Sequence, residues 1–198
     1  LLILWSDHLV KKQALFRKVI KTAEQLIKKD PDKIIFIGQK PRFASTNLGW
    51  LEFGDKITSL KGIDCFRFLS CHYRPDIKDA QKFYQDRRHA WNLGYFMTTP
   101  GFLLDLYKKF VPEMHKKLVL IGKTINTKQY PEVLSKVYPQ LEKISFDNAI
   151  LEKLDPKKGV VITEDLQWSD IGAWEALKEA LQKTPSENIT SGKVLTTD

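Results

Sequence analysis

The sequence Lys33-Ile34-Ile35-Phe36-Ile37-Gly38 is a short apolar run that ends at a glycine, which is the pattern of a buried strand. A second apolar run, Leu1 to Trp5, opens the chain, and helical periodicity fills the interval from Leu9 to Lys29. Strand, helix and strand in this order predict a parallel βαβ crossover. We therefore expect an α/β fold.

The remainder of the chain continues to alternate between the two kinds of pattern. Strands are predicted over 49–53, 56–60, 64–70, 90–97 and 160–162, and helices over 76–88, 100–109 and 173–183, with 114–141 helical in patches and a capped helix near Ser145. Gly54-Asp55 is expected to be the turn of a hairpin. We expect one domain over 1–184, and in 185–198 a linker or the start of a β-rich region.

Composition excludes several classes of protein. The 198 residues carry 32 Lys and Arg against 24 Asp and Glu, a net charge of +8, but the lysines are scattered in pairs, which favours a solvated surface over a nucleic-acid patch. No apolar run approaches the roughly 20 residues that cross a bilayer. The two cysteines give no disulfide framework, which favours a cytoplasmic location. The chain opens at Leu1 within an apolar run, so we expect the native protein to extend upstream.

Two aspartates are candidate metal ligands. Asp7 follows the first predicted strand, and Asp170 stands in Trp168-Ser169-Asp170-Ile171-Gly172, just before a predicted helix. Mg²⁺ prefers a few carboxylate oxygens together with substrate phosphates. Each aspartate is equally well explained by its neighbours as a residue that begins a helix. Beside Asp7, His8 could be a base or a ligand, although a packed structural role is the more frequent one.

Five segments, in order along the chain, resemble motifs of the mannose-1-phosphate guanylyltransferases. They are Trp5-Ser6-Asp7-His8, Ile37-Gly38-Gln39-Lys40-Pro41, Trp91-Asn92-Leu93-Gly94-Tyr95-Phe96, Ile144-Ser145-Phe146-Asp147-Asn148-Ala149-Ile150-Leu151-Glu152-Lys153 and Trp168-Ser169-Asp170-Ile171-Gly172-Ala173-Trp174. The last two are the most specific, and the resemblance runs to about residue 183. It implies a Rossmann-like nucleotidyltransferase sheet, mixed and mostly parallel, that is incomplete at its N-terminus.

The resemblance implies transfer of a guanylyl group from GTP to a hexose 1-phosphate such as mannose 1-phosphate, which gives a GDP-sugar and pyrophosphate. By position, Asp7 and Asp170 correspond to the family's metal-binding, catalytic aspartates, with Mg²⁺ as the cofactor. The residues that correspond to substrate-binding positions are Gly49, Arg74, Asn92, Asp147 and Glu152. A homodimer is a possible assembly, and neither nucleic acid nor a membrane is an expected partner.

The sequence also departs from the family pattern. The family's Gly-rich nucleotide loop has no counterpart, so we expect this chain alone to be inactive. The E-K-P motif is replaced by Tyr73-Arg74-Pro75, which keeps a positive charge but loses an acid. The sugar loop is reduced to Asn47-Leu48-Gly49-Trp50-Leu51. These changes motivate an alternative, a catalytically silent binding or regulatory subunit; a basic nucleic-acid-binding domain is a weaker one.

Overall fold

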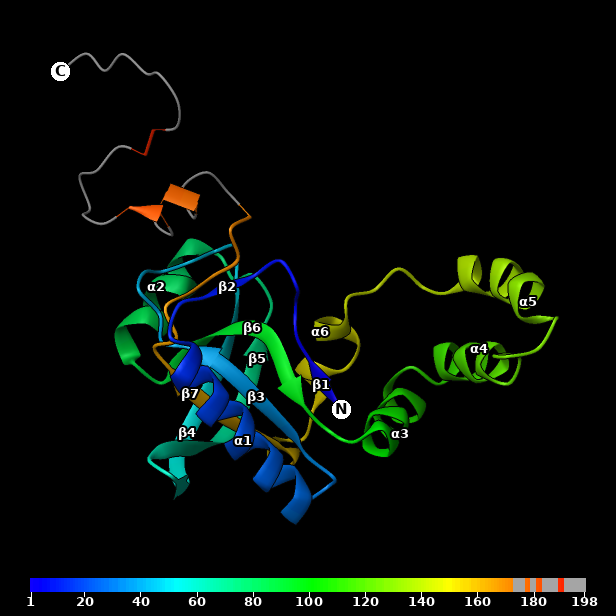
Figure 1. Ribbon diagram of the computed structural model, residues 1–198, viewed down its shortest axis with the longest axis horizontal. Coiled ribbons are helices and arrows are strands. Elements are labelled where there is room, and N and C mark those ends of the chain that lie inside the picture. Colours follow the sequence, from blue (N-terminus) through cyan, green and yellow to red (C-terminus); the bar gives the residue numbers. More distant parts are fainter. Residues whose placement is uncertain (173–176, 179–180, 183–188, 191–198) are drawn as a thin grey trace.

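A computed structural model describes residues 1–172, 177–178, 181–182 and 189–190 (Figure 1). The helix predicted over 173–183 and the tail predicted over 185–198 lie largely outside these residues. Within the part described, no helix is long and apolar enough to cross a membrane.

Strands and helices occupy most of the positions at which the sequence predicts them. The strands are β1 (Leu2–Ile3), β2 (Leu9–Val10), β3 (Ile34–Gln39), β4 (Gly49–Leu60), β5 (Ile63–His72), β6 (His89–Met97), β7 (Gly159–Glu164) and β8 (Trp168–Ser169). The helices are α1 (Gln13–Lys29), α2 (Ile77–Asp86), α3 (Pro100–Phe110), α4 (Pro112–Gly122), α5 (Tyr130–Val137) and α6 (Phe146–Ala149), with 3₁₀ turns η1 (Tyr138–Gln140), η2 (Leu151–Lys153) and η3 (Pro156–Lys158).

Six of these strands form one mixed sheet in the order β1-β6-β3-β7-β5-β4, which confirms the mixed α/β fold. Four strands, β1, β3, β4 and β7, run in one direction, and β5 and β6 run in the other. Among the described residues the only parallel neighbours are nevertheless β3 and β7. The sheet is therefore less parallel in its pairing than predicted, because the two reversed strands lie between strands of common direction.

The predicted crossover from the first strand to β3 is present, but β6 lies between its two strands. Met97 of β6 pairs with Leu2 on one side and with Ile35 on the other. The helix is shorter than predicted: α1 begins at Gln13, because Leu9 and Val10 form β2 and pair with β8 near the other end of the described chain.

The predicted hairpin turn at Gly54-Asp55 is wrong. These residues lie inside the 12-residue strand β4, where its register against β5 shifts. The chain instead reverses at Lys61 and Gly62, whose φ angles of 53° and 79° suit the two central positions of a type I′ turn. Since β4 pairs with β6 as well as with β5, the sheet curls back on itself.

The core has two halves, one on each face of the sheet. Along β3, Ile35 and Ile37 belong to one half, which includes the inner face of α1, whereas Ile34 and Phe36 belong to the other, with the inner face of α3. A strand buried on both faces reads as an unbroken apolar run, which explains the sequence of β3. Figure 1 shows α1 lying along the sheet, while α4 and α5 extend away from it beyond α3.

Candidate functional site

The two candidate metal ligands come together at one end of the short β2–β8 pair. Leu9 pairs with Ser169 in an antiparallel ladder, so Asp7 precedes one strand of the pair just where Asp170 follows the other. Both carboxylates act electrostatically on His8 between them. Asp7 is exposed and Asp170 is half-buried, which leaves their oxygens accessible from solvent. The structure thus brings together two residues that are 163 positions apart (170 − 7).

His8 is a packed, hydrogen-bonded residue in this arrangement. Its Nδ1 lies 3.2 Å from the indole Nε1 of Trp168, which can only donate, and 3.1 Å from the hydroxyl of Tyr95. The imidazole ring meets Trp168 edge-on with centroids 5.0 Å apart. Burial lowers the pKa of His8, and the nearby charges of Asp7 and Asp170 oppose that effect only in part. A neutral His8 that accepts at Nδ1 fits both the hydrogen bonds and the direction of the pKa.

The segment that carries Asp170 is anchored by a residue that sequence reasoning missed. Gln39, at the end of β3, is fully buried. Its Oε1 accepts from the backbone N–H of Leu166 at 2.9 Å and of Trp168 at 3.3 Å, and its Nε2 donates to Asp165 at 3.0 Å. Lys12 forms an ion pair with the same carboxylate. Burial opposes ionisation of Asp165, but the hydrogen bonds from Lys12 and Gln39 outweigh it and lower its pKa.

The backbone beside Asp170 is strained. Ile171 has a φ of 49°, in the left-handed region that β-branched residues almost never occupy. Such outliers cost about 1–3 kcal/mol and gather at functional sites. The backbone N–H of Gly172 donates to Oδ1 of Asp170 at 3.4 Å, a local turn of the kind that a capping aspartate makes. The capping role and the metal-binding role are therefore compatible, since the second carboxylate oxygen is not used by this turn.

The residues expected on the sugar side form a second cluster, centred on Asn92. Gly49 pairs with Asn92 across β4 and β6, and a Cβ added to Gly49 would lie 3.3 Å from the Cβ of Asn92. The Asn92 side chain donates from Nδ2 to Oδ1 of Asp147 at 3.0 Å. Its Oδ1 accepts from the backbone N–H of Gly94 at 3.0 Å. Asn92 is thereby held by both ends of its amide.

Glu152 connects this cluster to the segment that departs from the family pattern. Its carboxylate accepts from the backbone N–H of Tyr73 at 3.3 Å and from Nδ2 of Asn148 at 3.0 Å. Arg74 follows with a left-handed φ of 45°, and its guanidinium lies 5.3 Å from the centre of the Tyr73 ring. The structure therefore brings Glu152 close to Tyr73 and Arg74, while the role of these residues in sugar binding stays a prediction.

Burial dominates the electrostatics of the Asn92 cluster. It raises the pKa of Asp147; the charge of Glu152 adds to this effect, and the hydrogen bond from Asn92 reduces it. Burial also raises the pKa of the Cys71 thiol, with Asp147 and Glu152 contributing in the same direction. The Asp147 carboxylate, held by Asn92, can accept hydrogen bonds from sugar hydroxyls.

A bulge in β6 connects the two clusters. Ile37 of β3 pairs with Tyr95, but the next residue pairs with Asn92, so Leu93 and Gly94 are extra residues in β6. Gly94 has a φ of 68°, and a Cβ there would lie 2.3 Å from the indole nitrogen of Trp5. Trp5 in turn lies 6.4 Å from His8, measured between ring centres. Bulges re-aim side chains beside functional sites, and this one places Asn92 and Tyr95 toward the two clusters.

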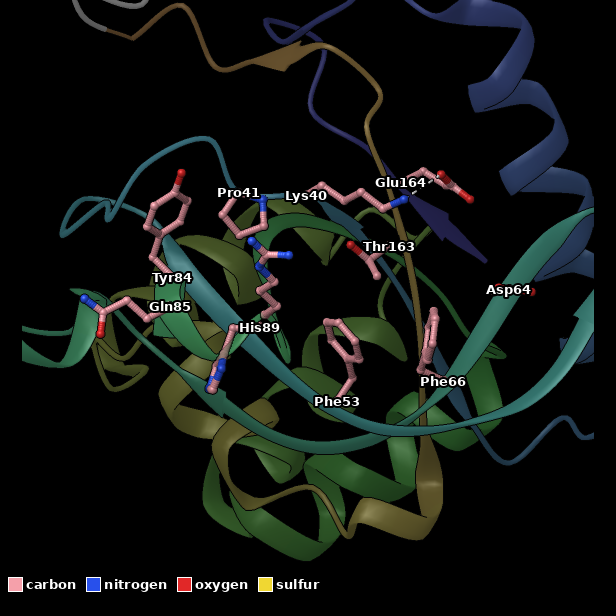
Figure 2. Close-up of a pocket in the computed structure, with 11 residues that line it drawn as sticks. Lys40, Pro41, Phe53, Asp64, Phe66, Tyr84, Gln85, His89, Thr163 and Glu164 are labelled. Carbon is pink, nitrogen blue, oxygen red and sulfur yellow. Dashed lines mark hydrogen bonds and ion pairs between the residues drawn. The ribbon is translucent and has the colours of Figure 1, made fainter. Parts of the chain in front are cut away.

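One hollow of the described surface lies away from the predicted site residues. A cavity of about 790 Å³ is lined by residues that include Lys40, Phe53, Arg87 and Thr163, and none of the predicted site residues is among them. Figure 2 shows Phe53 and Phe66 side by side on the curled sheet, below Thr163 and Lys40. The predicted site is instead a surface formed by the β2–β8 end and the β6 bulge.

Sequence comparison places the chain beside enzymes of one kind. It is 28% identical to mannose-1-phosphate guanylyltransferase 2 of Escherichia coli O157:H7, over 100% of this chain and 41% of the relative. It is also 28% identical to mannose-1-phosphate guanylyltransferase of Salmonella montevideo, over 98% of this chain and 41% of the relative. The chain thus spans about two fifths of the length of these curated relatives. No protein-family model matches it.

Structural comparison agrees on the fold. The crystal structure of a protein named mannose-1-phosphate geranyltransferase from Thermus thermophilus superposes with a TM-score of 0.80 at 23% identity, covering 97% of this chain and 52% of the other. A mannose-6-phosphate isomerase from Helicobacter pylori superposes with a TM-score of 0.65 at 21% identity, covering 85% and 62%. With the sequence relatives, these matches confirm the resemblance to mannose-1-phosphate guanylyltransferases that the ordered motifs predict.

Proposed function

We propose that the protein containing this chain transfers a guanylyl group from GTP to a hexose 1-phosphate such as mannose 1-phosphate, releasing pyrophosphate. The observation that carries this proposal is the meeting of Asp7 and Asp170 beside His8, at the positions where the family has its metal-binding aspartates. The names of the sequence relatives support the reaction class.

The donor chemistry of this pair fits Mg²⁺. Both groups are carboxylates at accessible positions, and Mg²⁺ is usually held by one or two carboxylates together with substrate phosphates and water. A Mg²⁺ ion bound there would neutralise the negative charge of the phosphates and help to orient them. Because phosphoryl-type transfer needs little covalent help from the protein, such positioning supplies most of the catalysis.

The Asn92 cluster is proposed to bind the sugar phosphate. Asn92 is fixed at both ends, so its amide is pre-organised rather than ordered on binding, which favours affinity. Asp147 and Glu152 supply carboxylate acceptors for sugar hydroxyls, and Arg74 supplies a positive charge for the phosphate. Gly49 lies against Asn92, and a larger residue there would press on the Asn92 side chain, because an added Cβ would lie 3.3 Å from the Cβ of Asn92.

A catalytically silent binding subunit is the second candidate. Two observations favour it: the family's acid is Tyr73 here, and Arg74 lies over the Tyr73 ring instead of pointing freely from the turn. A subunit of this kind would bind a sugar phosphate or nucleotide sugar without releasing pyrophosphate.

The two candidates are separated by a coupled pyrophosphate-release assay with GTP, Mg²⁺ and mannose 1-phosphate on the longest natural protein that contains this chain. We expect turnover that falls at least about 100-fold in Asp170→Asn, since a lost electrostatic group costs about 2.7–4 kcal/mol. Asp105→Asn, an exposed aspartate of α3, is the charge-matched control. Binding of GDP-mannose without turnover would support the silent subunit; neither binding nor turnover would overturn both.

A further inference from the structure

Three potential metal ligands meet on the face of the sheet that α2 covers, away from the Asp7–Asp170 pair. Glu52 pairs with His89 across β4 and β6, and with Ser70 across β4 and β5; His72 stands two residues beyond Ser70. Side chains alternate along a strand, so these registers put all four on one face. One ligating atom from each of Glu52, His72 and His89 lies within 4.8 Å of the others.

The hydrogen bonding of His89 leaves one of its ring nitrogens available to bind a metal ion. Its Nδ1 lies 2.9 Å from Oδ1 of Asp86, which fixes the tautomer that donates at Nδ1. The residue is only 5% exposed, and its buried Nε2 has no hydrogen-bond partner among the described residues. A carboxylate behind a histidine is the usual outer support of a metal ligand. In Figure 2 the His89 ring turns away from the other side chains of the cavity lined by Lys40 and Thr163.

A buried ring nitrogen without a hydrogen-bond partner destabilises the fold, and the aromatic ring packed against His89 offers it no polar group. The Phe83 ring of α2 stacks on His89 with centroids 4.2 Å apart, and it also meets the His72 ring at 4.8 Å. Leaving a buried acceptor without a partner destabilises the folded state. A ligand that accepts the Nε2 lone pair removes this cost, and a metal cation is such a ligand.

From this geometry we propose that Glu52, His72 and His89 bind one transition-metal ion of the zinc class. Two imidazole nitrogens and one carboxylate oxygen suit Zn²⁺ better than Mg²⁺, which prefers oxygen alone. Zinc ligands in a tetrahedral site stand about 3.3 Å apart, from bonds of about 2.0–2.1 Å. Glu52 Oε2 and His72 Nε2 are 3.9 Å apart, so small side-chain rotations close the site. The half-exposed Glu52 and His72 leave a route for the ion to enter.

Ser70 is the competitor that a metal must displace. Its hydroxyl lies 2.6 Å from Glu52 Oε2 and 2.8 Å from His72 Nε2, and it bridges the two ligands. Ser70 has one hydroxyl proton and donates it to Glu52, so His72 Nε2 donates to the Ser70 oxygen in this arrangement. Metal binding would require that proton of His72 to move to Nδ1, and a bond from Nε2 to the cation would replace the hydrogen bond to Ser70. The Ser70→Ala substitution should therefore keep or strengthen Zn²⁺ binding. If the cluster were held only by hydrogen bonds, the same substitution would destabilise it and bring no gain in Zn²⁺ affinity.

The proposed ion would tie β4, β5 and β6 together directly before the divergent turn. His72 is followed at once by Tyr73 and Arg74, so a ligand bond at His72 would fix the start of that turn. Metal occupancy would in this way stabilise the part of the surface that also contacts Glu152.

Zn²⁺ titration of the full chain by calorimetry, with Co²⁺ visible absorption as a second readout, tests this proposal. We expect one Zn²⁺ per chain and a higher melting temperature with Zn²⁺, because an ion that binds only the folded chain stabilises it. His72→Ala and the isosteric Glu52→Gln should each weaken binding at least tenfold. His115→Ala, a half-buried histidine of α4, is the matched control and should bind like wild type.

Circular dichroism establishes whether each variant is folded. If His72→Ala does not fold, the Zn²⁺ affinity of Glu52→Gln tests the proposal instead. Full Zn²⁺ affinity in folded His72→Ala or Glu52→Gln would overturn the proposal. Loss of Zn²⁺ in Asp170→Asn with retention in His72→Ala would do the same, because the ion would then belong to the other site.

Discussion

Asn92 and Asp147 are joined by a 3.0 Å hydrogen bond that connects β6 to α6 across 55 positions of the sequence. The bond directs the amide N–H of Asn92 into a carboxylate whose pKa is raised, chiefly by burial. Partial burial disfavours the charged form of Asp147 and so lowers the stability of the fold. A destabilising group of this kind is often kept because it has a function. A substitution of Asp147 can therefore raise the stability of the fold while it removes a group that is proposed to bind substrate.

We predict that Asp147→Asn stabilises the fold at neutral pH. The asparagine keeps an acceptor for Asn92 but has no charge to bury, so the melting temperature should rise by about 1–4 °C. A raised folded-state pKa means that wild type loses stability as pH rises from the ordinary carboxyl value of 3.8 through the raised value. The advantage of the variant should therefore vanish below that ordinary value, as thermal melts across pH would record.

Asp105→Asn removes the same charge from an exposed position of α3 and should leave the melting temperature within about 1 °C. If both variants shift the melt equally, net charge rather than burial of Asp147 is responsible.

Gly94→Ala should destabilise the chain by about 1–2 kcal/mol in a denaturant titration. The residue has a φ of 68°, which costs an L side chain about 1–2 kcal/mol, and the new methyl group would displace Trp5. Gly101→Ala is the matched control, because a Cβ there meets nothing within 4 Å and lies in the first turn of α3. Equal stability of the two variants would show that the bulge has no strict need of glycine.

His8 should make the fold sensitive to mild acid. Burial lowers its folded-state pKa from 6.5, so the unfolded chain takes up this proton more readily than the folded one. Stability should therefore fall as pH drops through 6.5 toward the lowered value, and His8→Asn, which can still accept from Trp168, should flatten that dependence. Unfolding free energies at about pH 8, 6.5 and 5, in the presence of a chelator, measure the slope; an unchanged slope contradicts the assignment.

Gln39→Ala should cost at least about 2 kcal/mol. Two buried backbone donors, those of Leu166 and Trp168, would lose their acceptor, and each unsatisfied group costs about 1–3 kcal/mol. The segment that positions Asp170 should loosen as well, so divalent-metal affinity should fall together with stability. Gln140→Ala, at an exposed position of η1, should change stability by less than about 0.5 kcal/mol. A stable Gln39→Ala with full metal affinity would show that the anchor is not needed.

Local pattern predicted much of this structure. The apolar run at 33–38 predicted a buried strand, and all six residues of β3 are buried. Ser145 accepts from the N–H of Asn148, as expected for a helix cap. Asp7 and Asp170 both act electrostatically on His8, while their role as metal ligands stays a prediction that comes from the resemblance and not from local pattern.

What the sequence missed depends on distant pairing. Gly54-Asp55 and Lys61-Gly62 are both good turn signals, and the second is used because β4 must stay extended to pair with β5 through Leu60. The insertion of β6 between β1 and β3 is likewise a matter of long-range register. The anchoring role of Gln39 could not be found from its neighbours in sequence, since Asp165 and Leu166, which it holds, lie more than 120 positions away.

The shared metal site is tested most directly by titrating Mn²⁺ into the Glu52→Gln chain and counting bound ions by electron paramagnetic resonance; that background removes the second proposed site. We predict one Mn²⁺ per chain that Mg²⁺ displaces. Asp7→Asn and Asp170→Asn should each abolish tight binding, with the double variant no weaker than either, because residues that bind one ion are not additive. Full Mn²⁺ binding in either single variant would contradict a metal ion shared by Asp7 and Asp170.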